Sequence, residues 1–292
     1  MAVTDRIRLE GGYHNDVWKV RRDGRTLVEK RYAVQAEPNP MYPNLPAQEA
    51  LALRSLAGTG CAPAFVDFVE RDADGRALLT YAFVPGAPWR RGVEDVARLL
   101  HTVHRVPVPR GLRRIPATPA GALESADAMV DAVPHRLSSD LRAVRPDLSR
   151  RAAASRPAAR SVVHTDCGPG NVMRGRRGVV LIDWQCPGAG DPVEDLACFR
   201  SPAMMILYGQ RPHSTATVRR FLAAYASLDS AAAASVQRHA EVGAAWHYRI
   251  GAYCVWRIHR LSRTQPDVAE RYRQAMLAEI DLLSSPSTVG VA

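Results

Sequence analysis

The chain has 292 residues, of which 47% are hydrophobic and 23% are charged, so it can bury one large core or two smaller lobes around a cleft. This composition excludes an intrinsically disordered chain. The formal net charge is +10, but the 37 arginines and two lysines are spread along the sequence, and no zinc-finger, RNP or homeodomain pattern accompanies them, so we expect no nucleic-acid partner.

The sequence carries no signal for secretion or for a membrane. The N-terminal segment has no apolar stretch of signal-peptide length, and no uninterrupted run of about 18 apolar residues occurs in the chain. Five scattered cysteines without a CxxC pair are typical of reduced thiols rather than of disulfides or a zinc site. We therefore expect a cytoplasmic protein with no membrane partner and no metal bound to sulfur.

The N-terminal part of the chain has the pattern of an antiparallel sheet that one helix interrupts. Short apolar or alternating runs separated by glycine-containing turns predict strands. These runs span residues 7–9, 17–20, 26–32, 65–69 and 77–84. Between the third and fourth runs, residues 46–57 have a leading proline, strong helix formers and a following Gly58, which predict a helix.

Beyond Pro85 and Gly86 the pattern becomes helical. The helices that we expect span residues 93–104, 122–132, 137–143 and 241–261. This change predicts two units, an N-terminal lobe of residues 1–84 and a C-terminal lobe of residues 85–292. The fold class is therefore α+β and bilobal, with an antiparallel sheet and one helix in the first lobe and mainly helices in the second.

A loop in the second lobe carries the main chemical pattern. His164, Asp166 and Asn171 form an H-x-D-x-x-x-x-N motif, and Asp183 ends the apolar strand that follows. This layout suits phosphoryl transfer, because one carboxylate can face an acceptor hydroxyl while the amide and the second carboxylate offer oxygens to Mg²⁺. Alone, the loop would be a weak signal, since its residues also favour turns.

Upstream features favour the catalytic interpretation. Gly11 and Gly12 lie in a hairpin that could cover phosphates, Lys30 lies on the third strand, and Glu49 lies in the helix, where it could hold that lysine. Lys30 is one of two lysines in a chain that otherwise uses arginine, which indicates a position that needs a compact ammonium. Lys30 or Glu49 alone would more often be an ordinary surface residue. Because all these residues occur in the order and the elements expected of a kinase, we interpret them as functional.

With these motifs the chain resembles the aminoglycoside phosphotransferase and choline kinase superfamily, which has a protein-kinase-like fold. The resemblance rests on the motifs GGxxNxVxxV, QEALALRSLA, LLTYAFVPG, HTDCGPGN and IDWQCPGAGDPVEDLA, which cover roughly residues 9–200. It implies that the lobe of residues 1–84 binds the nucleotide and that the lobe of residues 85–292 is the catalytic and acceptor-binding lobe. It implies that Lys30 contacts the α- and β-phosphates while paired with Glu49. It also implies that Asp166 is the catalytic base and that Asn171 and Asp183 are the Mg²⁺ ligands.

The resemblance extends to residues with less chemistry of their own. It implies that Gly11 and Gly12 form a shortened loop over the phosphates and that adenine rests on backbone groups of Ala82 and Val84. It further implies that Asp195 supports the catalytic loop.

Four residues near these motifs are assigned structural roles. His164 is interpreted as a buried hydrogen-bonding strut and Cys167 as a small packed residue. His101 and His104 are interpreted as partly exposed helix residues. None of the four enters the predicted catalytic set.

The sequence therefore predicts an ATP- and Mg²⁺-dependent small-molecule kinase, with GTP as an alternative nucleotide. The rival interpretation is a catalytically silent nucleotide-binding or scaffolding member of the same fold. A missing catalytic residue would favour this rival interpretation, but every expected catalytic position carries the expected residue. The acceptor is left open between a small alcohol, an amino alcohol and a nucleoside-like compound, and the oligomeric state is left open as well.

The C-terminal segment disfavours a polycationic acceptor. Residues 201–292 contain ten arginines and six acidic residues, so a kanamycin-like aminoglycoside is a poor match. A predicted helix in this segment places Trp246, Tyr253 and Arg257 on one face. We expect this face to pack in the core with Arg257 at its edge. The alternative is that Trp246, Tyr253 and Trp256 border a pocket for a modest, partly apolar or singly cationic acceptor.

Overall fold

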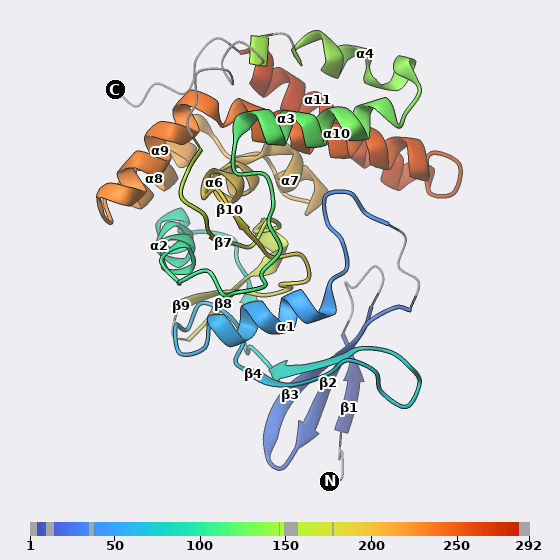
Figure 1. Cartoon of the computed structure of the whole chain (residues 1–292), viewed down its shortest axis with the longest axis vertical. Coiled ribbons are helices and arrows are strands. Elements are labelled where there is room, and N and C mark those ends of the chain that lie inside the picture. The colour runs from blue at the N-terminus through green and yellow to red at the C-terminus, as the bar shows by residue number, and fades with distance from the viewer. Residues whose placement is uncertain are drawn as a thin grey trace.

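The computed structural model describes residues 5–9, 15–34, 38–145, 147–148, 157–176 and 178–285. The N-terminal part contains a sheet and one helix, and the remainder is mainly helical, as Figure 1 shows from bottom to top. The predicted α+β class is therefore confirmed. The exact division between residues 84 and 85 stays a prediction.

Five antiparallel strands form the N-terminal sheet in the order β1-β2-β3-β5-β4. Their bounds are β1 Asp5–Arg8, β2 Asp16–Arg22, β3 Arg25–Arg31, β4 Phe65–Val69 and β5 Leu78–Ala82. All five predicted strands form, with ends shifted by a few residues. The central strand is β3, on which Lys30 is paired with Val17 on one side and Leu79 on the other. This position fixes the lysine from both sides.

Helix α1, Pro46–Ser55, follows β3 and packs on β4 and β5. Proline at its first turn lacks the N–H that would be unsatisfied there, which suits a helix start. Gly58 follows the helix with a φ of 80°, a backbone conformation that glycine adopts without a steric penalty. The predicted helix between the third and fourth strands is confirmed.

Nine further helices of the described chain form most of the C-terminal part (Figure 1). Their bounds are α2 Val93–His104, α3 Pro119–Asp131, α4 His135–Ala143, α6 Val193–Arg200, α7 Pro202–Leu207, α8 Thr215–Ala226, α9 Ser230–Val242, α10 Ala244–Leu261 and α11 Pro266–Ser284. The long helix α10 packs against α3 and α11. In the described ranges, no helix has both the length and the apolar character needed to cross a membrane.

The predicted helix over residues 241–261 is wrong at its start. Glu241 belongs to the end of α9, and α10 begins at Ala244 after a break at Gly243. A Cβ atom at Gly243 would lie 2.5 Å from the carbonyl oxygen of His239. Only glycine fits this close junction, so the chain turns where its apolar pattern alone reads as continuous.

Short strands hold the loop motifs in place. Strand β7, Ser161–Val163, pairs with β10, Gly188–Gly190. A second small sheet consists of β6 Ala87–Pro88, β8 Val172–Gly175 and β9 Gly178–Leu181. The H-x-D motif follows β7 directly, and Asp183 follows β9, so both carboxylates leave adjacent small sheets toward the same region.

Candidate active site

The ammonium of Lys30 joins two carboxylates. Its Nζ lies 2.8 Å from Oε2 of Glu49 and 2.6 Å from Oδ1 of Asp183. Burial lowers the pKa of Lys30, but Asp183 and Glu49 raise it more, so the net shift is upward and the lysine stays charged. The Tyr32 hydroxyl also donates to Glu49. Three predicted site residues far apart in sequence thus meet.

Asp195 holds the start of the catalytic loop. One of its carboxylate oxygens accepts the N–H of His164 and the other accepts the N–H of Thr165, each at 2.8 Å. Thr165 has a φ of 70°, which costs a β-branched residue on the order of 1–3 kcal/mol. Burial raises the pKa of Asp195, yet the hydrogen bond and charge of His104 lower it below its ordinary value. The ionised carboxylate therefore stabilises a strained turn.

The prediction that His104 is partly exposed is wrong. Its side chain is buried, with Nε2 at 3.1 Å from Oδ2 of Asp195 and Nδ1 at 2.7 Å from the hydroxyl of Tyr225. The reason lies in packing, because α2 covers β7 and α8. His101 is half-buried and contacts Asp229 at 2.9 Å, in line with the prediction.

The two other structural assignments are confirmed. His164 is fully buried, and its Nε2 donates to the carbonyl oxygen of Ile182 at 2.9 Å. The Cys167 thiol is also fully buried, and burial raises its pKa well above the ordinary value. A thiol in this state is a packing group and not a nucleophile.

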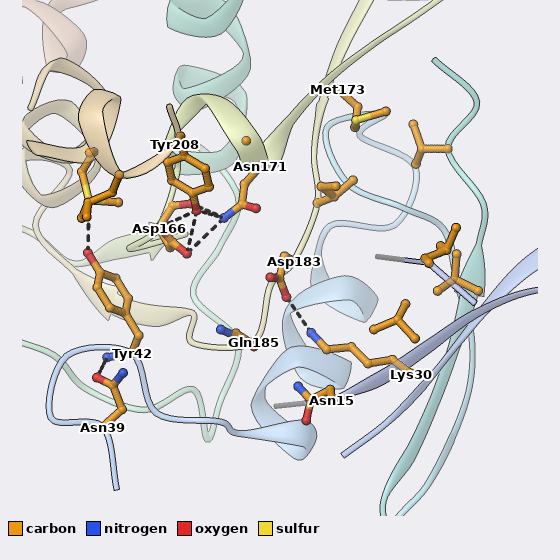
Figure 2. A pocket seen from close by; sticks show the side chains of 18 of the residues that line it. Asn15, Lys30, Asn39, Tyr42, Asp166, Asn171, Met173, Asp183, Gln185 and Tyr208 are labelled. Atoms are coloured by element: carbon orange, nitrogen blue, oxygen red, sulfur yellow. Dashed lines mark hydrogen bonds and ion pairs between the residues drawn. The ribbon is translucent and has the colours of Figure 1, made fainter. Parts of the chain in front are cut away.

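Asp166 lies on the cavity side of the loop among hydrogen-bond donors (Figure 2). Nδ2 of Asn171 donates to its Oδ2 at 3.1 Å, and the Tyr208 hydroxyl lies 3.1 and 3.2 Å from its two oxygens. Desolvation and the nearby charge of Asp183 raise the pKa of Asp166 to about 7, against the opposing effect of these two donors. A carboxyl with this pKa can accept a proton near neutral pH.

Tyr208 is a site residue that the sequence analysis missed. It follows α7, and its ring covers the catalytic loop, where a Cβ atom at Gly168 or Gly170 would lie 2.3 or 2.2 Å from ring carbons. The two glycines were interpreted only as turn residues. They also make room for an aromatic ring, and no sequence spacing connects them to position 208.

The contact with Tyr208 gives a pH-dependent prediction. Because the Tyr208 hydrogen bond lowers the pKa of Asp166, Tyr208→Phe should raise that pKa and move the acid limb of the kcat/KM profile to higher pH. In the wild-type protein we expect activity to fall as pH decreases through this limb, at or below about 7, since Mg²⁺ favours the ionised carboxyl. Initial rates between pH 5 and 9 check both statements. An unshifted limb in the variant would contradict the assigned contact.

The oxygens of Asn171 and Asp183 suit a hard cation. Nδ2 of Asn171 donates to Asp166 and Tyr208, while its oxygen points toward the Asp183 side of the cavity (Figure 2). Asp183 has a φ of 59°, so its carboxylate leaves the strand end in a left-handed turn. Within the described residues no group of three or more His, Cys, Asp or Glu side chains has an arrangement that could hold a metal ion. One carboxylate and one amide fit Mg²⁺, which takes its other ligands from phosphates and water.

One cavity of about 870 Å³ contains these groups. Val17, Val28 and Phe83 give it an apolar wall near Lys30, and Val84 also lines it. Ala82 is not in the lining, and its N–H donates to the carbonyl of Ala64 at 2.8 Å. Of the two predicted adenine contacts, only Val84 thus borders the cavity. Gly11 and Gly12 lie outside the described residues.

The aromatic face of α10 was predicted either to pack in the core or to border a pocket, and the cavity lining tests these two interpretations. Trp246 is 1% exposed and packs in the core, so its assignment to a pocket is wrong. Tyr253 and Arg257 do line the cavity, whereas Trp256 does not. The face therefore contributes to both the core and the cavity, because Trp246 is buried whereas Tyr253 and Arg257 border the cavity.

The geometry around Lys30 predicts that arginine cannot replace it. The ammonium fits between two carboxylates at 2.8 and 2.6 Å in a buried site, and a planar guanidinium is wider and more rigid. We expect Lys30→Arg to lower kcat/KM for ATP by at least about tenfold. Lys19→Arg, at the only other lysine, is the matched control and should stay near the wild-type value. Wild-type kinetics for Lys30→Arg would remove Lys30 from the phosphate site.

Solved structures share this fold at low sequence identity. A spectinomycin phosphotransferase in complex with ADP and spectinomycin matches with a TM-score of 0.66 and 13% identity over 97% of this chain and 93% of that chain. A choline/ethanolamine kinase family protein from Mesorhizobium loti matches with a TM-score of 0.65 and 17% identity over 97% and 89%. An amicoumacin kinase in complex with AMP-PNP, Ca²⁺ and its substrate matches with a TM-score of 0.65 and 13% identity over 97% and 90%. The kinase-like architecture is thereby confirmed.

Sequence comparison leads to the same group. No curated protein matches the chain. The model of the phosphotransferase enzyme family, to which aminoglycoside phosphotransferases belong, matches residues 5–237. That match spans the sheet, the catalytic loop and the helices as far as α9, and it confirms the resemblance inferred from the motifs. The chain belongs to the phosphotransferase enzyme family.

Proposed function

We propose that the protein is an ATP- and Mg²⁺-dependent kinase that phosphorylates a hydroxyl group of a small molecule. The observation that carries this proposal is the convergence of Lys30, Asp166, Asn171 and Asp183 on one cavity. A lysine between two carboxylates, close to a third carboxyl group with a raised pKa, is the set of groups that phosphoryl transfer requires. Neighbours of the same fold in complex with ADP or AMP-PNP support a nucleotide as donor.

In this mechanism the acceptor hydroxyl lies against Asp166. The acceptor oxygen forms a bond to the γ-phosphorus, the bond from that phosphorus to the β–γ bridging oxygen breaks, and Asp166 takes the hydroxyl proton. The products are ADP and the phosphorylated acceptor. Asn171 and Asp183 hold Mg²⁺, which neutralises charge on the phosphate oxygens when it is bound.

The remaining residues orient the nucleotide. Lys30 contacts the α- and β-phosphates, and Glu49 keeps its ammonium in place. We assign Gly11 and Gly12, which lie outside the described residues, to the phosphates, and adenine to the part of the cavity that Val84 borders. Nothing in these contacts distinguishes ATP from GTP, so both nucleotides belong in the test.

The test is an ADP-release assay with ATP and GTP against a panel of small alcohols, amino alcohols, nucleosides, sugars and aminoglycosides. Calorimetry with and without Mg²⁺ on the same preparation measures nucleotide binding. Metal-dependent nucleotide binding with turnover of an acceptor supports the proposal. Nucleotide binding without turnover of any acceptor supports the silent alternative, and absence of binding contradicts both.

A further inference from the structure

The end of the cavity away from Lys30 has walls of unusual composition. In Figure 2, Tyr42 and Asn39 lie on the Tyr208 side of the site, opposite Lys30. Helices α10 and α11 complete this end with Tyr253, Tyr272, Arg257 and Arg271. We call these four residues together with Tyr42 the acceptor end. Three tyrosines and two arginines make a surface that is aromatic and positive.

Negative charge is confined to the catalytic groups. Among the described lining residues the only carboxylates are Asp166 and Asp183, and both face the phosphate region. The acidic residues of the C-terminal helices lie elsewhere. Glu194, the acidic residue that could have supplied charge to this end, is 3% exposed and forms a double contact with Arg249 at 2.8 Å. Among the described residues, a cationic acceptor would therefore find no carboxylate at the acceptor end.

Within the described residues, the guanidinium of Arg257 has no partner of opposite charge. Its Nε is shielded from solvent and has no hydrogen-bond partner, and in the described part of the chain neither Arg257 nor Arg271 forms an ion pair. The Arg257 guanidinium lies 5.4 Å from the ring centre of Tyr272. Because Arg257 also lines the cavity, an anionic oxygen of a bound ligand can pair with its guanidinium and supply the missing opposite charge.

The tyrosines supply the remaining contact surface. The rings of Tyr42 and Tyr253 meet edge to face with centres 4.9 Å apart, and Tyr253 and Tyr272 meet similarly at 6.0 Å. Asn39 donates to the Tyr253 hydroxyl at 3.0 Å, which holds that ring in place. Such a rigid aromatic surface favours a flat or apolar ligand body.

We propose that the acceptor carries an oxyanion group, a carboxylate or a phosphate, that binds Arg257 and Arg271 while its hydroxyl reaches Asp166. This inference rests on the proposed kinase function and narrows the acceptor classes that the sequence left open. A guanidinium binds two oxygens of one planar group at once, which an ammonium cannot do. The two arginines also offset the repulsion between an anionic acceptor and the nucleotide phosphates.

Four compounds of one scaffold test the charge preference. They are para-(hydroxymethyl)benzoate, para-(hydroxymethyl)benzamide, para-(hydroxymethyl)benzylamine and para-(hydroxymethyl)phenyl phosphate, which differ in charge and share one hydroxyl. We expect kcat/KM for an anionic compound to exceed that of the amide by about ten- to a hundredfold, with the amine lowest. The carboxylate and phosphate arms identify which oxyanion the site prefers.

Binding provides a readout that does not depend on turnover. Each compound is titrated into protein saturated with Mg²⁺ and AMP-PNP, and the same order of affinity is expected. Equal affinities, or tightest binding of the amine, would overturn the proposal. If AMP-PNP itself fails to bind, the proposed kinase function is contradicted instead, so the two failures are distinguishable.

Substitutions connect the preference to the two arginines. In Arg257→Met and Arg271→Met the ratio of anion to amide affinity should fall toward one, with the larger fall for the less exposed Arg257. Arg263→Met, at an exposed arginine outside the cavity, is the control and should keep the wild-type ratio. A preference that persists in both variants contradicts the assignment. If Arg257→Met does not fold, Arg271→Met and the wild-type titrations still decide.

Discussion

Replacement of Asp166 by asparagine is expected to lower turnover by about two to four powers of ten, the usual contribution of a positioned base. The variant keeps the size of the side chain and the hydrogen bond from Asn171 to the backbone oxygen of residue 166, which measures 2.8 Å. It removes the group that accepts the proton. Because the nucleotide contacts assigned here lie on Lys30 and Asp183, the affinity for nucleotide should change little.

Single-turnover rates and calorimetric nucleotide binding measure these two effects separately. Asp267→Asn changes an exposed aspartate at the start of α11 and serves as the matched control. A turnover above about one tenth of the wild-type value in Asp166→Asn would remove Asp166 from the role of base. A parallel loss of nucleotide affinity would instead indicate that the loop itself has changed conformation.

The pairing of Lys30 with Glu49 could be predicted from sequence, whereas the contact of Lys30 with Asp183, 153 positions away, is a finding of the structure. The prediction depended on element type and order, because a lysine on a third strand and a glutamate in the next helix match the phosphate-contacting lysine of a kinase and the glutamate that holds it. The structure brings the three side chains together at hydrogen-bond distance. Their roles in catalysis remain proposals.

Packing across distant elements could not be predicted in the same way. Tyr208 reaches Asp166 because α7 follows α6 in a tight corner, and no periodicity of the sequence encodes that contact. His104 has the spacing of an amphipathic helix edge, but α8 and Asp195 enclose it. In both cases a polar side chain forms a hydrogen bond with a partner more than 40 positions away in the sequence. Such contacts follow from tertiary structure and not from local pattern.

At the acceptor end, the sequence composition predicts the net charge but not the positions of the charged side chains. The composition of the C-terminal segment correctly indicated positive charge, since ten arginines outnumber six acidic residues there. Composition could not show which arginines face the cavity. Of the described charged residues on these helices, Arg257 and Arg271 are the ones that line the cavity. The position of two side chains, rather than the net charge, therefore narrows the acceptor.

Replacement of Asp183 by asparagine is expected to have the second large effect, because it weakens Mg²⁺ binding and so lowers turnover. Asparagine tolerates the left-handed backbone at this position, where φ is 59°, better than alanine does. The variant therefore removes charge with little change in shape. A bound cation contributes several kcal/mol to phosphoryl transfer, so we expect turnover with Mg²⁺ to fall by about a thousandfold. Asn171→Ala, which removes a neutral oxygen ligand, should weaken Mg²⁺-dependent nucleotide binding less.

The direction in which the ADP affinity of Asp183→Asn changes without Mg²⁺ distinguishes a metal-binding role of Asp183 from a structural role. Asp183 carries a negative charge 2.6 Å from the Lys30 ammonium that is proposed to contact the phosphates. In EDTA, its neutralisation removes repulsion toward the nucleotide and frees Lys30 for the phosphates, so ADP should bind equally well or more tightly than to the wild-type protein. With Mg²⁺ present, the same variant should bind ADP more weakly. Equal losses under both conditions would mean that Asp183 supports the fold of the site and does not hold the cation.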